Sequence, residues 1–397
     1  MHLCYFLYWY HASCANRCYL SWARARSPSR SLPLSLSLPL ATSPVHPQLG
    51  EIMLCFIALT HLVPTLVITG LVAPVFSPLS SLGQLNLSAI PGNAAFLNST
   101  GVKWIFTAGS TGESVDLTLL ERKALAEAWI AAAPAFDMRV IVHVGSDSVA
   151  DMMDMAAHAE AHGANAIAAM PPTYIRPTTM DALVATMGAV AHAAPKTPFY
   201  YYHIPIKTGV ALSMPDFVAA ANEAIPTLNG IKFTDPTMNE FQLAFDFRFT
   251  KGAEWRVGKG PNMLFGHDEM LIASLPYGTE GAVGTTYNFN AEVQYRILEG
   301  WNNGNVSAAL FAQKATTSLI SAIVGVEKKV DGAYIWKMLM DLIGQPMGPA
   351  RLPYTPPTQE GREALKVAVR AWCKEFKTIA PSWCAGVVAT TESVSSV

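Results

Sequence analysis

The central part of this 397-residue sequence lacks cysteine. Four cysteines precede residue 56, and the other two are Cys373 and Cys384 near the end. This distribution argues against a disulfide framework or a thiolate metal cage in the core. Cys14 and Cys18 have a CxxxC spacing, but there is no second pair of the kind that a zinc site requires.

A strong net charge is also lacking. The chain has 27 basic and 29 acidic residues, which give a formal charge of −2. No whole-protein field would draw such a chain to nucleic acid or to an anionic membrane. We find no local basic patch in the sequence, so nucleic acid is not expected as a partner.

The N-terminal region lacks acidic residues and regular periodicity. No Asp or Glu precedes Glu51, and the first fifty residues carry four Arg, no Lys and a Ser/Pro/Leu-rich run. Such a stretch cannot build a packed core. We interpret residues 1–65 as a disordered leader, either a transit-like peptide or translated upstream sequence with Met53 as the true start. The expected location is cytoplasmic, or an organelle if residues 1–52 are a genuine transit peptide.

One uncharged run at 52–76 is long enough to span a bilayer. Pro64 and Gly70 interrupt it, and its second half equally resembles a buried strand. We therefore predict the first strand at 66–73 and keep a membrane or signal role for 53–65 as the alternative.

From residue 66 onward, short apolar runs alternate with longer helical stretches. Most of the runs lack polar alternation, as strands covered on both faces do. Thr118 and Glu121 form a capping box before one helix. Eight such units predict an α/β fold, a (β/α)8 TIM barrel. An open doubly wound sheet is the competitor, but the Gly-rich fingerprint expected after its first strand is absent. The predicted strands lie at 66–73, 102–109, 139–145, 164–170, 198–205, 228–235, 262–266 and 281–286.

Further helical stretches follow the eighth unit, at about 305–324, 331–343 and 358–378. The predicted organisation is therefore a leader followed by a barrel, a C-terminal helical extension packed on the barrel, and a flexible tail. Their predicted bounds are 1–65, 66–304, 305–380 and 381–397.

Polar residues gather where strands end, which in a barrel is where chemistry takes place. The turn 109–113, GSTGE, has glycines that let backbone N–H groups approach an anion, although it lacks the spacing and lysine of a P-loop. Strand alternation places Tyr200 and Tyr202 on one face and Tyr201 on the other. Lys232 interrupts an apolar strand, where it either has a functional role or reaches the barrel rim.

A lysine and a phenol on neighbouring strands form a chemical pair. A free lysine amine attacks a ketone to make a Schiff base, and apolar surroundings favour the free amine over the ammonium ion. A phenol such as Tyr202 can then move the proton that travels when a carbon–carbon bond breaks.

Six motifs in order over about 66 to 355 resemble one family. They are GSTGE, YYYHIP, GIKFTD, FGHDE, GTTYNF and PMGPARLP. Together they look like the family of Schiff-base aldolases that holds N-acetylneuraminate lyase and dihydrodipicolinate synthase, and they most resemble its lyase branch. The resemblance implies cleavage of N-acetylneuraminate to N-acetylmannosamine and pyruvate, without metal or organic cofactor, in a homo-oligomer that is commonly tetrameric.

The resemblance also implies roles for individual residues. Lys232 would be the Schiff-base lysine and Tyr202 the proton-relay phenol, while Ser110 and Thr111 would hold the substrate carboxylate. Tyr174 would support the relay from near the subunit interface. The positions matching those that contact the polyhydroxy part of a sugar acid are Thr234, Gly266, Asp268, Glu269 and Thr285.

Lys207 is a departure from the lyase pattern. It stands where sugar-acid lyases usually carry an apolar residue and the synthase branch carries an arginine that binds a second carboxylate. The alternatives are therefore another pyruvate-dependent aldolase or synthase, either dihydrodipicolinate synthase-like or a 2-keto-3-deoxy sugar acid aldolase. A non-catalytic sugar-acid-binding barrel is the third reading. It would be expected to have lost Lys232 or Tyr202, and the sequence retains both.

His158 and His162 lie four residues apart on a predicted helix, with Glu160 between them. The HExxH order of a zinc helix is absent, and histidines are favourable at a helix C-terminus. We therefore expect no metal site.

Overall fold

The computed structural model describes residues 66–249, 260–326 and 332–389. The predicted leader at 1–65, with its alternative membrane segment at 53–65, lies outside the described residues. Within the described residues, no helix is both long enough and apolar enough to cross a membrane.

Eight parallel strands close into a barrel in sequence order, and β1 hydrogen-bonds both β2 and β8. This confirms the predicted fold class. Seven of the predicted apolar runs contain their strand, and the first strand begins four residues later than expected, at Gly70, and ends one residue beyond its run, at Pro74. The strands are β1 Gly70–Pro74, β2 Trp104–Thr107, β3 Arg139–His143, β4 Ala166–Ala169, β5 Phe199–His203, β6 Leu228–Phe233, β7 Asn262–Phe265 and β8 Gly281–Val283.

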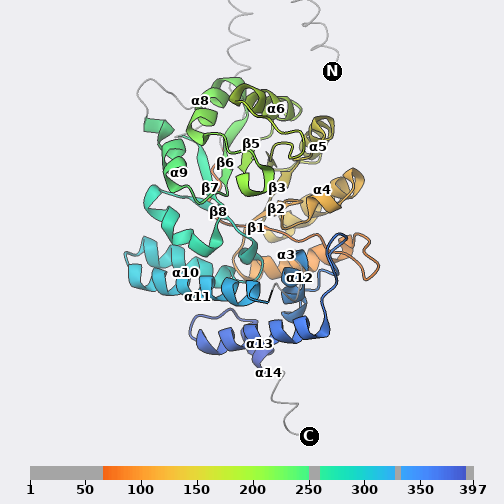
Figure 1. Ribbon diagram of the computed structural model, residues 1–397, viewed down its shortest axis with the longest axis vertical. Coiled ribbons are helices and arrows are strands. Elements are labelled where there is room, and N and C mark those ends of the chain that lie inside the picture. The colour runs from red at the N-terminus through yellow and green to blue at the C-terminus, as the bar shows by residue number, and fades with distance from the viewer. Residues whose placement is uncertain (1–65, 250–259, 327–331, 390–397) are drawn as a thin grey trace, which may run out of the picture. The chain divides into compact units, whose positions relative to one another are not determined.

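Helices surround the strands, as Figure 1 shows, and connect each strand to the next. Thr118 caps α4 as predicted, since its hydroxyl accepts from the Glu121 N–H while Glu121 accepts from the Thr118 N–H. The α-helices of the barrel are α3 Ile90–Ser99, α4 Leu119–Ala132, α5 Val149–Ala161, α6 Met180–His192, α7 Pro205–Thr208, α8 Met214–Ala224, α9 Met238–Phe245 and α10 Ala291–Asn302. Short 3-10 helices lie at η1 Leu87–Ala89, η2 Ser114–Asp116, η3 Ala133–Phe136, η4 Asp246–Phe249, η5 Asp268–Tyr277 and η6 Thr285–Asn288.

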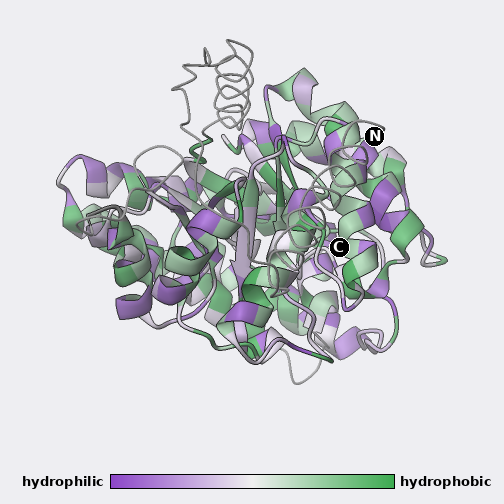
Figure 2. Cartoon of the chain, turned by 90° about the horizontal axis from the view of Figure 1, so that it is seen from above, coloured by the Kyte–Doolittle hydropathy of each residue, from purple (hydrophilic) through white to green (hydrophobic). Residues whose placement is uncertain are grey.

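Both faces of the strands are buried. Tyr200 and Tyr202 belong to an apolar cluster inside the barrel, whereas Tyr201 belongs to the larger cluster between strands and helices. The predicted alternation along β5 is therefore confirmed. Figure 2 shows that the helices carry hydrophobic and hydrophilic residues along their length, as expected of helices buried on one side only.

Four helices of the described residues follow the barrel, and Figure 1 shows the first two of them beside α10 and α3. They are α11 Val306–Val324, α12 Gly332–Leu342, α13 Gln359–Glu375 and α14 Cys384–Ala389. α11 packs on α10, and α13 packs on α11, where the Trp372 indole donates to the Ala315 carbonyl over 2.8 Å.

The predicted start of the flexible tail, residue 381, is too early because a helix follows it. Helix α14 covers Cys384–Ala389, and a disulfide joins Cys384 to Cys373 in α13. Both cysteines are buried at this contact between α13 and α14. Both cysteines belong to the buried core cluster, and their spacing in the sequence does not predict that they pair.

Candidate functional site

Tyr202 and Lys232 are adjacent on neighbouring strands, paired in the register of β5 and β6. The Lys232 Nζ lies 3.8 Å from the centre of the Tyr202 ring and 4.4 Å from the centre of the Phe106 ring. Both rings therefore lie within the distance of a cation–π contact with the Lys232 side chain. Tyr202 is 2% exposed and Lys232 is 4% exposed.

His143, at the end of β3, was missed by the sequence analysis although it interrupts the apolar run RVIVHVG. The His143 ring and the Phe106 ring each contact the Tyr202 ring edge to face, and the centre of each lies 5.8 Å from the centre of the Tyr202 ring. The His143 Nδ1 lies 2.8 Å from the Ala108 carbonyl, and the Met170 N–H donates to Nε2 over 3.4 Å. Nδ1 therefore carries the proton.

The charge state of His143 follows from its surroundings. Burial, together with the positive charges of Arg122 and Lys232, holds the pKa of His143 well below its usual range. A neutral imidazole results. The imidazole packs against Tyr202 and donates a hydrogen bond to the carbonyl of Ala108. Ala108 directly precedes the GSTGE turn and has a left-handed backbone conformation, with a φ of 54°.

The GSTGE turn brings hydroxyls to this pair. The Ser110 Oγ lies 3.4 Å from the Tyr202 hydroxyl, and the Thr111 Oγ1 lies 2.7 Å from the Thr285 Oγ1. A Cβ on Gly112 would lie 3.0 Å from the Val75 carbonyl, so the close approach of the turn to β1 favours glycine. The structure thus gathers four predicted site residues, Ser110, Thr111, Tyr202 and Thr285, at one end of the barrel.

Asp268 and Glu269 follow β7 at the same end, and their environments differ. Burial raises the pKa of Asp268, whose Oδ2 accepts the Thr286 N–H over 2.7 Å. Burial is the largest single effect on Glu269 and acts to raise its pKa, but the 2.8 Å hydrogen bond from the His267 Nδ1, the charge of His267 and further hydrogen bonds together lower that pKa. Two adjacent carboxyl groups therefore differ in their tendency to ionise, an arrangement suited to recognising hydroxyls as donor and as acceptor.

Gly266 and Thr234 lie against each other at the ends of β7 and β6. The Thr234 hydroxyl occupies the space that a Cβ on residue 266 would need. Within the described part of the chain, this buried hydroxyl oxygen has no hydrogen-bond partner. A buried polar atom of this kind is available to a ligand.

Tyr174 is not brought to the pair within one chain. Its side chain is 87% exposed, and its backbone N–H donates to Asp147 Oδ1 over 3.1 Å. Lys207 is also exposed and lies in α7, directly after β5.

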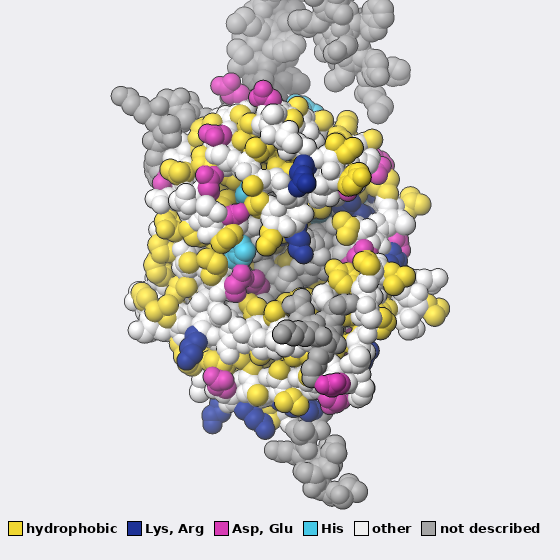
Figure 3. Space-filling model, in the orientation of Figure 1, with side chains coloured by type: hydrophobic (Ala, Val, Ile, Leu, Met, Phe, Trp, Pro, Cys, Tyr) yellow, Lys and Arg dark blue, Asp and Glu magenta, His cyan; other side chains and the backbone are white. Residues whose placement is uncertain are grey.

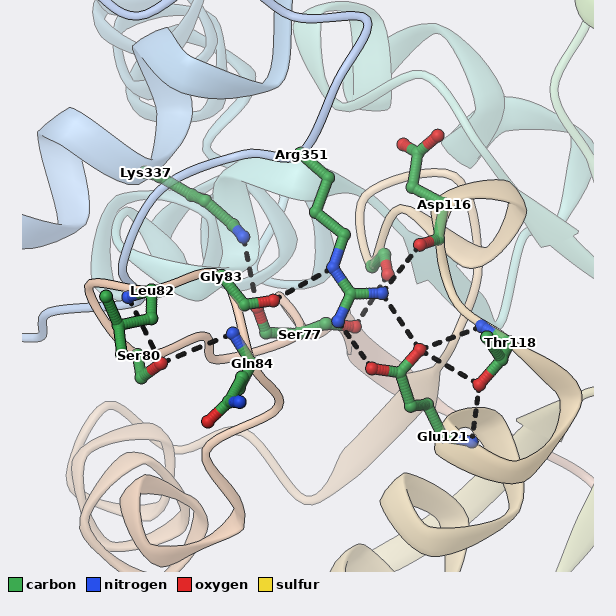
Figure 4. A network of polar contacts seen from close by, with 11 residues as sticks. Ser77, Ser80, Leu82, Gly83, Gln84, Asp116, Thr118, Glu121, Lys337 and Arg351 are labelled. Atoms are coloured by element: carbon green, nitrogen blue, oxygen red, sulfur yellow. Dashed lines mark hydrogen bonds and ion pairs between the residues drawn. The ribbon is translucent and has the colours of Figure 1, made fainter.

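The C-terminal segment 332–353, which we call the strap, contacts the GSTGE turn and the loops after β1 and β2, and Figure 4 shows two of its side chains, Lys337 and Arg351. The Lys337 Nζ forms a buried 2.7 Å ion pair with Glu113 and donates to the carbonyls of Ser77 and Pro349. Burial raises the pKa of Glu113 against the attraction of Lys337, and burial lowers the pKa of Lys337. Burial thus penalises both charges, so each depends on the other.

Arg351 makes the second strap contact. Its guanidinium binds both carboxylate oxygens of Glu121 and donates to the carbonyls of Gly83 and Asp116, over 3.0 and 2.8 Å (Figure 4). This fork lowers the pKa of Glu121 to about 2. The motif PMGPARLP therefore acts on the loops after β1 and β2, and both contacts escaped the sequence analysis.

The face drawn in Figure 3 carries isolated basic and acidic side chains among apolar and neutral ones.

The profile of the Dihydrodipicolinate synthetase family matches residues 67–372. N-acetylneuraminate lyase A of Xenopus laevis is 37% identical over 286 residues, 72% of this chain and 90% of that protein. N-acetylneuraminate lyase of Homo sapiens is 34% identical over 304 residues, 76% and 92% of the two chains.

A solved structure shares the architecture. The N-acetylneuraminate lyase of Proteus mirabilis has a TM-score of 0.70 and 32% identity, covering 77% of this chain and 99% of that one. The family profile spans more than half of the chain, and the lyases exceed 30% identity over most of their length. The chain therefore belongs to the Dihydrodipicolinate synthetase family of Schiff-base (class I) aldolases, which are carbon–carbon lyases.

Proposed function

We propose that this aldolase is an N-acetylneuraminate lyase that cleaves N-acetylneuraminate reversibly to N-acetylmannosamine and pyruvate. The observation that carries the proposal is the buried pair Lys232 and Tyr202 facing the hydroxyls of the GSTGE turn. The similarity to N-acetylneuraminate lyases supports the choice of substrate.

The proposed reaction begins when the Lys232 amine adds to the C2 ketone of the open-chain sugar acid and water leaves, which gives an iminium ion. Tyr202 gives its phenolic proton to the hydroxyl that leaves as water and becomes a phenolate. It then takes the proton of the C4 hydroxyl, the C3–C4 bond breaks, and the electrons of that bond enter the iminium to form an enamine. N-acetylmannosamine departs as the aldehyde. Protonation of the enamine at C3 and hydrolysis then release pyruvate and the free lysine. The iminium is the electron sink, so the mechanism uses no further cofactor.

Substrate binding is assigned by position. Ser110 and Thr111 would receive the carboxylate, because their hydroxyls and the turn's backbone lie beside the pair. The polyhydroxy chain would meet the residues after β6, β7 and β8, which include one unpartnered hydroxyl and two carboxyl groups. These are Thr234, Gly266, Asp268, Glu269 and Thr285.

Lys207 favours a second candidate. An exposed cation after β5 suits an acidic co-substrate, so a synthase that condenses pyruvate with another aldehyde is the alternative.

Borohydride trapping tests both candidates. The protein is incubated with pyruvate and borohydride, and peptide mass spectrometry locates the reduced adduct, which we expect on Lys232. Lys232→Met should lose the adduct, whereas Lys207→Met should keep it. Release of pyruvate from N-acetylneuraminate is then assayed. An adduct without release would favour the synthase, and no adduct would overturn both candidates.

We also propose a homo-oligomer, with a tetramer as the family resemblance implies. Its partner is a second copy of this chain. Val115, Tyr174 and Ile175 are exposed apolar side chains, and Val115 shares a cavity of about 200 Å³ with Thr173, the neighbour of Tyr174. Covering this patch would bring Tyr174 into a subunit interface, where it could support the relay. The location stays a prediction, cytoplasmic or an organelle if residues 1–52 are a transit peptide.

A further inference from the structure

Three side chains capable of binding a metal meet on the outer surface of α4 and α5. Glu127 comes from α4, and His158 and His162 lie at the end of α5. One ligand atom from each lies within 4.8 Å of the other two. The Glu127 Oε1 is 2.8 Å from the His158 Nε2 and 3.8 Å from the His162 Nε2.

The two imidazoles are already arranged as a pair. Their spacing of four residues puts them on one helix face, with ring centres 4.1 Å apart. The His162 Nδ1 lies 2.8 Å from the His158 carbonyl, so it donates its proton there. The lone pair of His162 is therefore on Nε2, the nitrogen that faces Glu127. Metal-ligating histidines are oriented in this way by a second hydrogen bond.

The spacing suits a small divalent ion. Zinc binds imidazole nitrogen and carboxylate oxygen at about 2.0–2.2 Å, which places tetrahedral ligands about 3.4 Å apart. The measured 2.8 and 3.8 Å lie on either side of that value. Glu127 and His162 are 49% and 43% exposed in their side chains, so both can adjust and an ion can reach them from solvent.

Glu160 is not part of the group, although it lies between the histidines in sequence. Its carboxylate accepts from the Lys196 N–H over 2.8 Å and from the Thr197 hydroxyl over 2.9 Å. The third ligand instead comes from a different helix, 31 residues from His158. The expectation of no metal rested on sequence neighbours and could not include Glu127.

We propose that Glu127, His158 and His162 form a zinc site that clamps α4 to α5, with water completing the coordination. On binding, His158 takes the tautomer with its proton on Nδ1, so the Nε2 lone pair binds the metal and the metal replaces the hydrogen bond between Nε2 and Glu127. Helix α5 runs back from the end of β3 to the start of β4, so its last turn lies at the end of the barrel opposite Lys232. The site is therefore structural and separate from the aldol chemistry.

Zinc titration of the full chain against a chromophoric chelator tests the proposal. The chain contains ten histidines and six cysteines, so the site is measured as a difference between variants. We expect His162→Ala to bind one zinc equivalent fewer than the wild type, and Glu127→Gln to weaken that equivalent by about tenfold or more. His192→Ala is the matched control, because His192 makes the same bond to a carbonyl four residues earlier but lies outside this group.

A second measurement locates the ion. Zinc should protect His162 from diethyl pyrocarbonate, as read by peptide mass spectrometry, and should leave the labelling of His192 unchanged. It should also raise the midpoint of thermal unfolding of the wild type more than that of His162→Ala. Equal zinc stoichiometry in wild type and His162→Ala, or equal labelling of His162 with and without zinc, would overturn the site.

Discussion

At the scale of single residues, the site depends on how Tyr202 is held. Phe106 and neutral His143 pack against its ring, Lys232 lies over one ring face, and Ser110 meets its hydroxyl. Strand alternation predicted that this ring shares a face of β5 with Tyr200 and not with Tyr201, and the structure places that face inside the barrel. It could not predict His143 as a neighbour, because β3 and β5 come together only through the order of strands in the closed barrel.

Tyr202→Phe removes only the hydroxyl that is proposed to move the proton. Positioned acid–base groups contribute about 10²–10⁴-fold. We expect kcat for release of pyruvate from N-acetylneuraminate to fall within that range, while borohydride trapping of pyruvate on Lys232 persists.

Tyr200→Phe is the matched control for this variant. Tyr200 lies on the same face of β5, but its hydroxyl donates to Asn262 over 2.9 Å, away from Ser110. It should lower the free energy of unfolding by about 1 kcal/mol and leave kcat near the wild-type value. Equal losses of kcat in the two variants would contradict the role of Tyr202.

At the scale of elements, the strap joins the end of the chain to the loops at the mouth of the barrel. Its ion pair with Glu113 is buried, whereas its arginine fork with Glu121 is only partly so. The two contacts therefore make different predictions.

Lys337→Met should be strongly destabilising because it leaves the Glu113 carboxylate buried without a partner. Loss of one partner of such a pair costs about 3–5 kcal/mol. Adding Glu113→Gln should recover much of this free energy of unfolding, measured with urea. The control Lys366→Met removes an exposed pair with Glu363 and should cost less than about 1 kcal/mol. If the double variant were no more stable than Lys337→Met, the uncompensated charge would not be the cause.

Glu121 predicts a pH dependence. Its folded-state pKa of about 2 lies below the ordinary 4.5, so its contribution to stability is present above pH 4.5 and is lost as the pH falls towards 2. Glu121→Gln should lower the free energy of unfolding by about 1–3 kcal/mol at pH 7, and the difference from wild type should shrink across that window. Glu363→Gln serves as the exposed control. A difference that stayed constant from pH 7 to 3 would refute the assignment.

Local patterns predicted the elements well, and long-range side-chain pairs poorly. Apolar runs located the eight strands, and the spacing of Thr118 and Glu121 identified a cap, because both signals lie within a few residues. Glu121 also binds Arg351, 230 residues away. No local pattern encodes that contact, and the disulfide of α13 and α14 escaped prediction for the same reason.

At the scale of the whole molecule, the barrel has no free strand edge, so association must use side chains. The exposed apolar patch of Val115, Tyr174 and Ile175 is the surface proposed for a second copy.

Replacing Val115 and Ile175 together by Asp should dissociate the oligomer, since two buried carboxylates would then face the partner. Analytical ultracentrifugation should show a smaller species than the wild type. Val367→Asp, an exposed apolar position on α13, should leave the mass unchanged. A wild-type chain that sediments as a monomer would disprove the oligomer.

Contacts between the first strand and C-terminal segments also determine when the barrel can close during synthesis. β1 gains its second neighbour only when β8 exists, and Lys337 reaches Ser77 across 260 residues. At about 5–20 residues per second, that interval is on the order of tens of seconds on the ribosome. For that time the nascent barrel presents an open strand edge and a Glu113 without its cation. The time for which these groups stay unpaired is therefore set by the rate of translation and not by the stability of the finished fold.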